Sequence, residues 1–482
     1  MNRNARLYLL TVSVVGLGIF FILHFGDRLP APPSPFSTES VARSSLNVTA
    51  VGDSSFFASL ESSLRQNGAN PLSRLFLQLL IIVSAPCAVG WTFTRFGQPA
   101  VVGEMIAGIL LGPSLFGLLA PNIFQFVFAA SSLDALRLFS QIGVCLFMFA
   151  VGMELDVSQL RHKAQTAIVV SHSSIVIPYF LGVALALFLY SYLAQPGATF
   201  SAFALFMGIS MNMTAFPVLV RILRDRGLFK SPLGSTATAC AAVDDVTAWS
   251  ILAFVVAIAR ATSATSMGGA TFRLGLVLLF VALMLFVLKP NLPRWLGKSA
   301  LDRPEPDKIV LALVVGVVLL SALCTELIGI HALFGAFLAG IIMPNIGGFR
   351  DNLVVRVENL RSVLLLPVFF AFTGLRTQIG LLNQAQDWAI CLVIIGVATL
   401  GKLEGSALAG RLTGTKWRES LQLGALMNTR GLMELIALNI GYDLAILSQR
   451  IFTMLVLMAL FTTVMTGPLL TLFEKRPRVA RV

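Results

Sequence analysis

The chain is dominated by apolar stretches that are long enough to cross a lipid bilayer as helices. Such a helix needs about 20 mostly apolar residues, and the 482 residues hold fourteen stretches of this kind. They begin near Arg6, Ser73, Pro99, Leu138, Ala164, Phe200, Leu233, Phe272, Lys308, His331, Ser362, Trp388, Ser420 and Ile451. Only 12% of the residues are charged, whereas a soluble domain carries about 25%. The sequence therefore predicts an all-α polytopic membrane protein surrounded by membrane lipid.

The Lys and Arg residues predict how the chain is oriented. If the N-terminus is cytoplasmic, most of them fall on the same side, with clusters in residues 221–230 and 289–308 and in a basic tail of residues 475–482. Cytoplasmic loops of membrane proteins carry such an excess. Because fourteen is even, both termini are expected in the cytoplasm, and the bacterial inner (plasma) membrane is the expected location. The net charge of +12 then reflects topology, and no nucleic-acid partner is expected.

Two units precede the main body of the chain. Residues 1–26 lack a clear small-x-small cleavage site, which favours an uncleaved membrane anchor over a signal peptide. Residues 27–70 are rich in Pro, Ser and Thr, a composition typical of a disordered linker, here on the extracytoplasmic side. The remaining thirteen stretches are expected to form the core.

Three pairs of segments repeat along the core at a constant offset of seven stretches. The pairs are 103–113 with 335–344, 149–155 with 370–376, and 211–214 with 427–430. In the first pair, both segments place two glycines five positions apart ahead of a proline. An odd offset reverses the direction of crossing, so the pattern predicts an inverted-topology repeat, which is typical of alternating-access transporters. Any single match has a second interpretation, generic packing of small residues between membrane helices.

The repeat divides the core into two halves. The first six-span half covers residues 71–271 and the second covers residues 308–474, with a linker span and loop in residues 272–307. The predicted fold is a 13-span inverted-repeat core with one extra N-terminal span. The sequence predicts a transporter and not an enzyme.

Two stretches carry signals of an interrupted helix. Residues 212–217 place Asn and Thr, whose side chains compete with backbone hydrogen bonds, ahead of a proline that has no backbone donor. Residues 428–431 do the same with a glycine. Broken helices at mid-membrane are the usual binding site of inverted-repeat transporters, although a simple kink is the alternative. The residues expected to support the breaks are Asn212, Phe216, Pro217, Asn428, Thr429, Arg430 and Glu434.

Asp244 and Asp245 are adjacent carboxylates in the middle of an apolar stretch. A carboxylate in such surroundings costs several kcal/mol unless it is protonated, paired or coordinating a cation. Burial and repulsion between like charges favour the protonated form, so that one group can hold either a proton or a cation. Neighbours on a helix point about 100° apart, so the two acids are expected to act separately. The alternative is an interhelical hydrogen bond between two neutral acids.

Two basic residues also lie inside predicted spans. Lys402 lies in the middle of its stretch, which argues against snorkelling to the interface and makes it the expected partner of Asp244. Arg430 has Glu434 one turn later, and an intrahelical ion pair is expected to satisfy both. The cysteines and histidines show no metal-ligand spacing, and no cofactor is expected.

The sequence resembles the monovalent cation:proton antiporter-2 family over roughly residues 73 to 474. The resemblance rests on residues 97–113, on Thr214-Ala215-Phe216-Pro217, on Val243-Asp244-Asp245-Val246 and on residues 329–337. The chain departs from the family at Asn428-Thr429-Arg430, where small or proline residues are more usual.

The resemblance implies an antiporter that exchanges Na⁺ or K⁺ for H⁺, built from two broken crossing helices and assembled as a homodimer. By the same resemblance, Asp245 binds the transported cation or the proton, Asp244 pairs with Lys402, and Thr214 lies beside the site. A potassium efflux channel or a sensor on the same fold is the alternative, because fold alone does not fix function. A sodium-coupled symporter of an organic anion is a third reading, but no substrate pocket for it is visible in the sequence.

Overall fold

The computed structural model describes residues 3–26, 67, 70–154, 164–262, 267–297, 307–346 and 348–473. Within these ranges the chain is helical, and the only extended pairing is an isolated bridge between Ala194 and Leu447. The predicted basic tail lies outside the described residues, as does nearly all of the predicted linker of residues 27–70.

The apolar stretches coincide with helices. Among the described residues, eleven helices are long and apolar enough to cross a membrane, and two shorter apolar helices cover Ser13–Gly26 and Ala332–Ile341. The stretch that begins near Ser420 is divided between α20 (Trp417–Met427) and α21 (Leu432–Asp443). An all-helical membrane protein is therefore confirmed, while the count of thirteen spans in the core stays a prediction.

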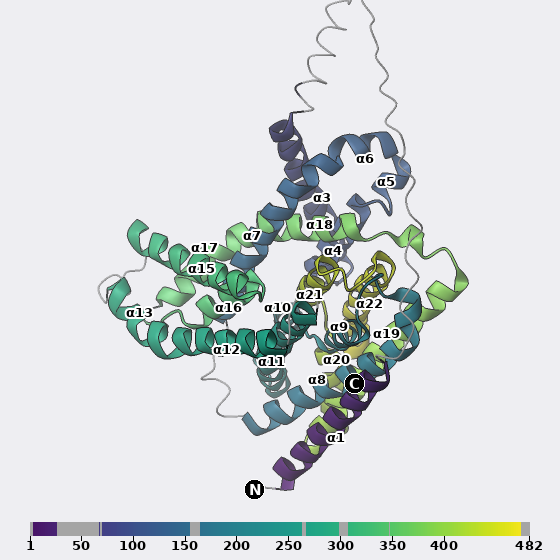
Figure 1. Cartoon of the computed structure of the whole chain (residues 1–482), viewed down its shortest axis with the longest axis vertical. Helices are drawn as coiled ribbons and strands as arrows, with labels where there is room; N and C mark the ends of the chain where they lie inside the picture. The colour runs from purple at the N-terminus through teal and green to yellow at the C-terminus, as the bar shows by residue number, and fades with distance from the viewer. Residues whose placement is uncertain are drawn as a thin grey trace, which may run out of the picture.

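We call one group of helices the carboxylate bundle, because it includes α11 (Pro232–Thr262), the helix that carries Asp244 and Asp245 (Figure 1). Besides α11, α20 and α21 it comprises α8 (Ala164–Leu193), α9 (Phe200–Asn212), α10 (Phe216–Asp225), α19 (Ala385–Leu412) and α22 (Gln449–Phe473). The N-terminal helix α1 (Arg3–Gly26) packs on α8 and α9.

We call the second group the glycine bundle, because its helices cross at glycine residues. It comprises α3 (Pro71–Arg95), α4 (Ala100–Leu111), α5 (Phe116–Leu119), α6 (Pro121–Val127), α7 (Ala130–Glu154), α15 (Lys308–Ile328), α16 (Ala332–Ile341), α17 (Phe349–Leu360) and α18 (Leu366–Arg376). A Cβ atom at Gly374 would overlap the carbonyl group of Gly108, where α18 crosses α4. A Cβ atom at Gly340 would likewise overlap the backbone of α7. Glycine lets these backbones touch, as is common between membrane helices.

A long helical segment runs between the two bundles. It consists of α12 (Met267–Ala282), a π-helical turn (Leu283–Leu288) and α13 (Lys289–Leu296), and α12 contacts both α11 and α15 (Figure 1). Otherwise few helix pairs pack closely across the boundary, α4 with α22 being one of them. The structure is thus two tightly packed bundles whose helices rarely approach one another closely, and buried side chains fill the boundary between them.

Candidate functional site

The two interrupted helices meet at their breaks. The first break separates α9, which ends at Asn212, from α10, which begins at Phe216. The second separates α20 from α21 across residues 428–431. The backbone N–H of Ala215 donates to the carbonyl of Thr429 over 2.9 Å. This hydrogen bond joins one break directly to the other.

Local sequence explains both interruptions. Pro217 occupies the first turn of α10, where the missing backbone donor costs no hydrogen bond. Gly431 has a φ of 150°, a conformation that residues with a Cβ atom rarely adopt. The structure therefore breaks the helices at the residues that the sequence singled out.

Asp244 is held by four side chains around it. Lys402 Nζ lies 2.8 Å from Asp244 Oδ2, and both side chains are fully buried. The Thr214 hydroxyl contacts the same oxygen, and Lys402 also donates to that hydroxyl over 2.5 Å. The other oxygen, Oδ1, accepts from Ser174 over 2.9 Å and from Ser171 over 3.3 Å. Both oxygens are occupied and the charge is balanced by Lys402.

Asp245 has a different environment, although it is the next residue of α11. Its side chain is only 2% exposed, and Oδ2 has no hydrogen-bond partner. The backbone of Phe216, at the start of α10, interacts with the carboxyl group. A buried carboxyl oxygen without a partner is costly when charged. A proton or a desolvated cation would remove that cost.

Arg430 connects the second break to the first. Its guanidinium group donates to the carbonyls of Ser210 and Met211, each over 2.6 Å, and more distantly to that of Ala398 over 3.4 Å. The carbonyls of Ser210 and Met211 belong to the last turn of α9, where a helix has no partners of its own and carries partial negative charge. The positive charge of Arg430 thus satisfies that helix end.

Glu434 is less well satisfied than the sequence suggested. It lies 3.5 Å from Arg430 Nη1, while its other oxygen, Oε1, has no partner. Arg430 lies in the break and not in the helix, so its closest contacts are with α9. The predicted ion pair is present, but it does not satisfy the carboxyl group.

The remaining predicted residues lie around the breaks. Thr429 donates from its hydroxyl to that of Thr466 over 3.3 Å. Asn212 and Asn428 are fully buried, and neither atom of either side-chain amide has a hydrogen-bond partner. Each amide can therefore bind a water molecule or an ion.

The structure gathers most of the predicted residues in one place and adds two. Asp244, Thr214 and Lys402 are in direct contact, with Asp245 next to them in α11. Ser171 and Ser174 were not singled out from the sequence. Their only signal is the short polar run Ser171-His172-Ser173-Ser174 within an apolar stretch, and serine is common in membrane helices.

A comparison with protein families identifies the chain. Residues 79–474 match the family of sodium/hydrogen exchangers, transmembrane. The chain belongs to this family. The match covers the carboxylate bundle and nearly all of the glycine bundle.

Related proteins agree with this assignment. The chain is 41% identical over 409 residues to a Na⁺/H⁺ antiporter, NhaS4, of Synechocystis, covering 85% of this chain and 99% of that protein. It is 38% identical to Cation/H⁺ antiporter 17 of Arabidopsis thaliana, covering 83% of this chain and 49% of that protein. It is 32% identical to K⁺/H⁺ antiporter 1 of Saccharomyces cerevisiae, covering 84% and 46% respectively. The chain spans nearly all of the first relative and about half of the other two.

A solved structure shares the fold. The sodium proton antiporter MjNhaP1 of Methanocaldococcus jannaschii superimposes with a TM-score of 0.56, covering 82% of this chain and 96% of that one. The sequence identity is 15%, so this likeness concerns the fold alone.

Proposed function

We propose that the protein is a secondary antiporter that exchanges Na⁺ or K⁺ for H⁺ by alternating access, with Asp245 as the shared binding group. The observation that carries this proposal is the contrast between two adjacent buried acids. Asp244 is neutralised by Lys402, whereas Asp245 has an unpartnered oxygen beside the helix breaks. The printed names of the relatives support the choice of ions.

The exchange follows from competition for one site. Asp245 is too deeply buried to stay charged and empty while it crosses the bilayer. It crosses with a proton or with a cation, and binding of either displaces the other. Thr214 and the unpartnered side-chain oxygens of Asn212 and Asn428 at the breaks supply further oxygen ligands for a cation, since hard cations prefer oxygen. Transfer of the two ions in opposite directions is the result.

The alternating-access part of the proposal rests on an inverted repeat of residues 71–271 and 308–474, linked by residues 272–307. Contacts in the glycine bundle support it. Segment 103–113 crosses segment 370–376 at glycine, and segment 335–344 crosses segment 149–155 in the same way. Replacing each segment of the first crossing by its predicted repeat partner gives the second crossing. This is expected for halves related by a pseudo-two-fold axis in the membrane plane.

The location and assembly complete the proposal. We place the protein in a bacterial inner membrane as a homodimer, with residues 1–26 as an anchor and both termini, including the basic tail 475–482, in the cytoplasm. The excess of Lys and Arg on one side supports the orientation.

The direct test is proton flux in sealed proteoliposomes with an imposed pH gradient, to which Na⁺, K⁺ or Li⁺ is added in turn. Wild-type protein should collapse the gradient when the transported cation is present, and Asp245→Asn should not. Serine 250, an exposed residue on the same helix, offers a matched control, and Ser250→Ala should behave as wild type. Cation flux without proton movement in both wild type and Asp245→Asn would overturn the antiporter proposal and favour a channel.

A further inference from the structure

A polar cluster joins the two bundles at one end of the molecule. Arg376, the last residue of α18, lies 2.6 Å from Asp443, the last residue of α21. It also donates to Asn439 over 2.8 Å, and Arg137 of α7 lies 3.4 Å from the same Asp443 carboxyl group. Asn439 in turn donates to Thr373 of α18 over 2.9 Å. We call Arg137, Arg376, Asn439 and Asp443 the interbundle cluster.

The four contacts just described all cross the boundary between the bundles. The arginines belong to α7 and α18 of the glycine bundle, whereas the asparagine and the aspartate belong to α21, the second half of a broken helix. The Arg376 side chain is 13% exposed and that of Asp443 is 20% exposed. Partial burial makes the charged hydrogen bonds stronger than those of an exposed ion pair.

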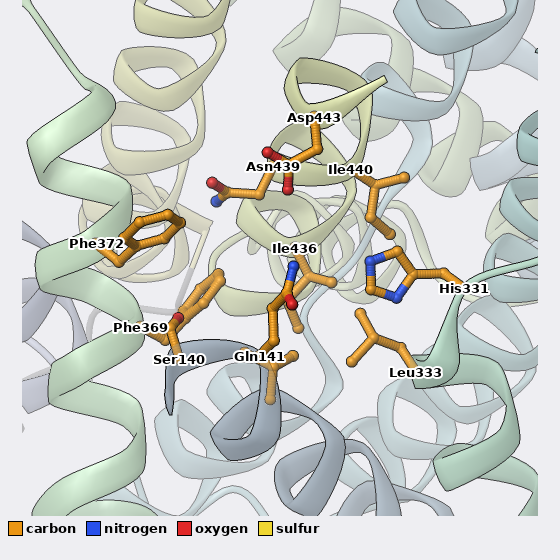
Figure 2. A pocket seen from close by; sticks show the side chains of 11 residues that line it. Ser140, Gln141, His331, Leu333, Phe369, Phe372, Ile436, Asn439, Ile440 and Asp443 are labelled. Carbon is orange, nitrogen blue, oxygen red and sulfur yellow. The ribbon is translucent and has the colours of Figure 1, made fainter. Parts of the chain in front are cut away.

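A pocket lies directly against this cluster. Figure 2 shows the polar side chains of Gln141, Asn439 and His331 around it, with Asp443 at its rim and Phe369 and Ile436 on its walls. The lining comes from α7, α18 and the start of α16 on one side and from α21 on the other. The pocket is therefore a space between the two bundles.

Aromatic side chains pack between α11 and α16 near this pocket. Trp249, one turn after Asp245 in α11, packs edge-on against Phe334 at 5.7 Å between ring centroids and lies 6.3 Å from Phe337. Both phenylalanines belong to α16, which begins at the pocket beside His331. Trp249 is only 2% exposed. Packed side chains thus close the boundary between α11 and α16 at this end.

The direction of α11 supports this order. The bridge between Ala194 and Leu447 places the start of α9 at the end of the molecule where α21 ends. The α9–α10 segment then runs to the opposite end, and α11 returns toward the cluster. Trp249 consequently lies on the side of Asp245 that faces the cluster end of the molecule.

We propose that Arg376 and Asp443 are positioning residues of the exchange: they hold the end of α21 against α18 and keep the pocket end of the boundary closed. This inference rests on the proposed function, because it assigns the contacts to one of two alternating states. Opening this end requires the bundles to shift, and a shift must break the contacts of Arg376 with Asp443 and Asn439. A substitution that removes these contacts therefore favours the state that is open at the pocket.

The test is the rate at which a cysteine placed at Gln141 reacts with a membrane-impermeant maleimide. Gln141→Cys is combined with Arg376→Gln, and the reagent is added to right-side-out and to inside-out vesicles. Labelling is counted above that of the same chain without the added cysteine, since natural cysteines are present. The rate should rise about tenfold from the pocket side, as expected for the loss of one charged hydrogen bond.

A matched control lies at the same end of the molecule. Arg450 of α22 contacts Tyr192 and Asp387, but all three residues belong to the carboxylate bundle. Arg450→Gln should leave the labelling rate unchanged. A rise equal to that of Arg376→Gln would indicate general loosening and overturn the inference.

A charge exchange gives the second readout. Because Arg137 lies 3.4 Å from Asp443 and would repel an arginine there, the exchange is made with Gln141→Cys on an Arg137→Gln background. On that background Arg376→Asp should label quickly, and adding Asp443→Arg should return the rate toward that of Arg137→Gln alone. An unchanged rate in Arg376→Gln, or no rescue by the exchanged pair, would refute the assignment. Labelling is independent of transport: if the rates follow these expectations while wild type exchanges no ions, the proposed function fails, but the conclusion that these contacts hold the two bundles together at this end stands.

Discussion

The buried pair of Lys402 and Asp244 leads to a prediction that does not depend on transport. The change is a double-mutant cycle of Lys402→Met, Asp244→Asn and both together. Each single variant removes one charge of a fully buried pair that is 2.8 Å apart and leaves the other charge without compensation. The double variant removes both charges. Each single variant should therefore be less stable than the double variant.

The magnitude follows from the burial of both groups. Leaving one member of a buried ion pair unpaired costs about 3–5 kcal/mol. A chain of 482 residues loses less melting temperature per kcal/mol than the about 2–4 °C of a domain of 150–250 residues, so each single variant should lose at most roughly 20 °C. The double variant loses hydrogen bonds but carries no buried charge, so its loss should be about 1–3 kcal/mol, or at most roughly 12 °C.

The assay is the thermal unfolding of purified protein in detergent, followed by the fluorescence of its tryptophans at a fixed scan rate and pH. Asp245→Asn serves as a reference, because it removes a neighbouring buried acid that has no basic partner. Additive losses, with the double variant less stable than either single variant, would refute a coupled ion pair at this position.

Three further predictions concern other parts of the fold. Arg430→Lys should lower stability by about 1–3 kcal/mol, because one ammonium group cannot replace the guanidinium group that donates to two carbonyls at the end of α9. The melting temperature of the purified variant checks this. Gly374→Ala should reduce the yield of folded protein, since its Cβ would overlap the backbone of α4, whereas Gly396→Ala, with open space around it, should not; size-exclusion profiles compare the two. Ser174→Ala should cost about 1.5–3 kcal/mol by removing a hydrogen bond to charged Asp244, and an equal loss in Ser174→Ala on an Asp244→Asn background would contradict that reason.

Much of the fold could be predicted from sequence because the bilayer imposes a strict requirement. Backbone polar groups in lipid must be satisfied within helices, so long apolar stretches define the helices. The short helix α16 and the broken α20–α21 were still recognised, since each lies in an apolar stretch. The division into two bundles could not be predicted, because the partner of each glycine crossing depends on tertiary packing.

In the candidate site, the charged residues are easier to predict from sequence than the neutral ones. Asp244, Asp245 and Lys402 stand out in sequence because a charge inside a membrane span is costly. Ser171 and Ser174 do not, because a hydroxyl group can satisfy itself on its own helix. Arg376 and Asp443 lie near helix ends, where charges are ordinary, so only the structure reveals that they touch. Arg430 was recognised, but its main partners are backbone carbonyls, which no residue pattern identifies.

The glycine crossings have a mechanical consequence. Where backbone rests on backbone, as between α4 and α18, there are no flexible side chains to absorb a displacement. The boundary between the bundles is packed by side chains instead, which can change rotamer when the bundles shift. Each bundle should therefore move as a rigid body, and the deformation should be confined to the boundary. Substitutions inside either bundle should change the yield of folded protein, whereas substitutions at the boundary should change the rate at which the folded protein works.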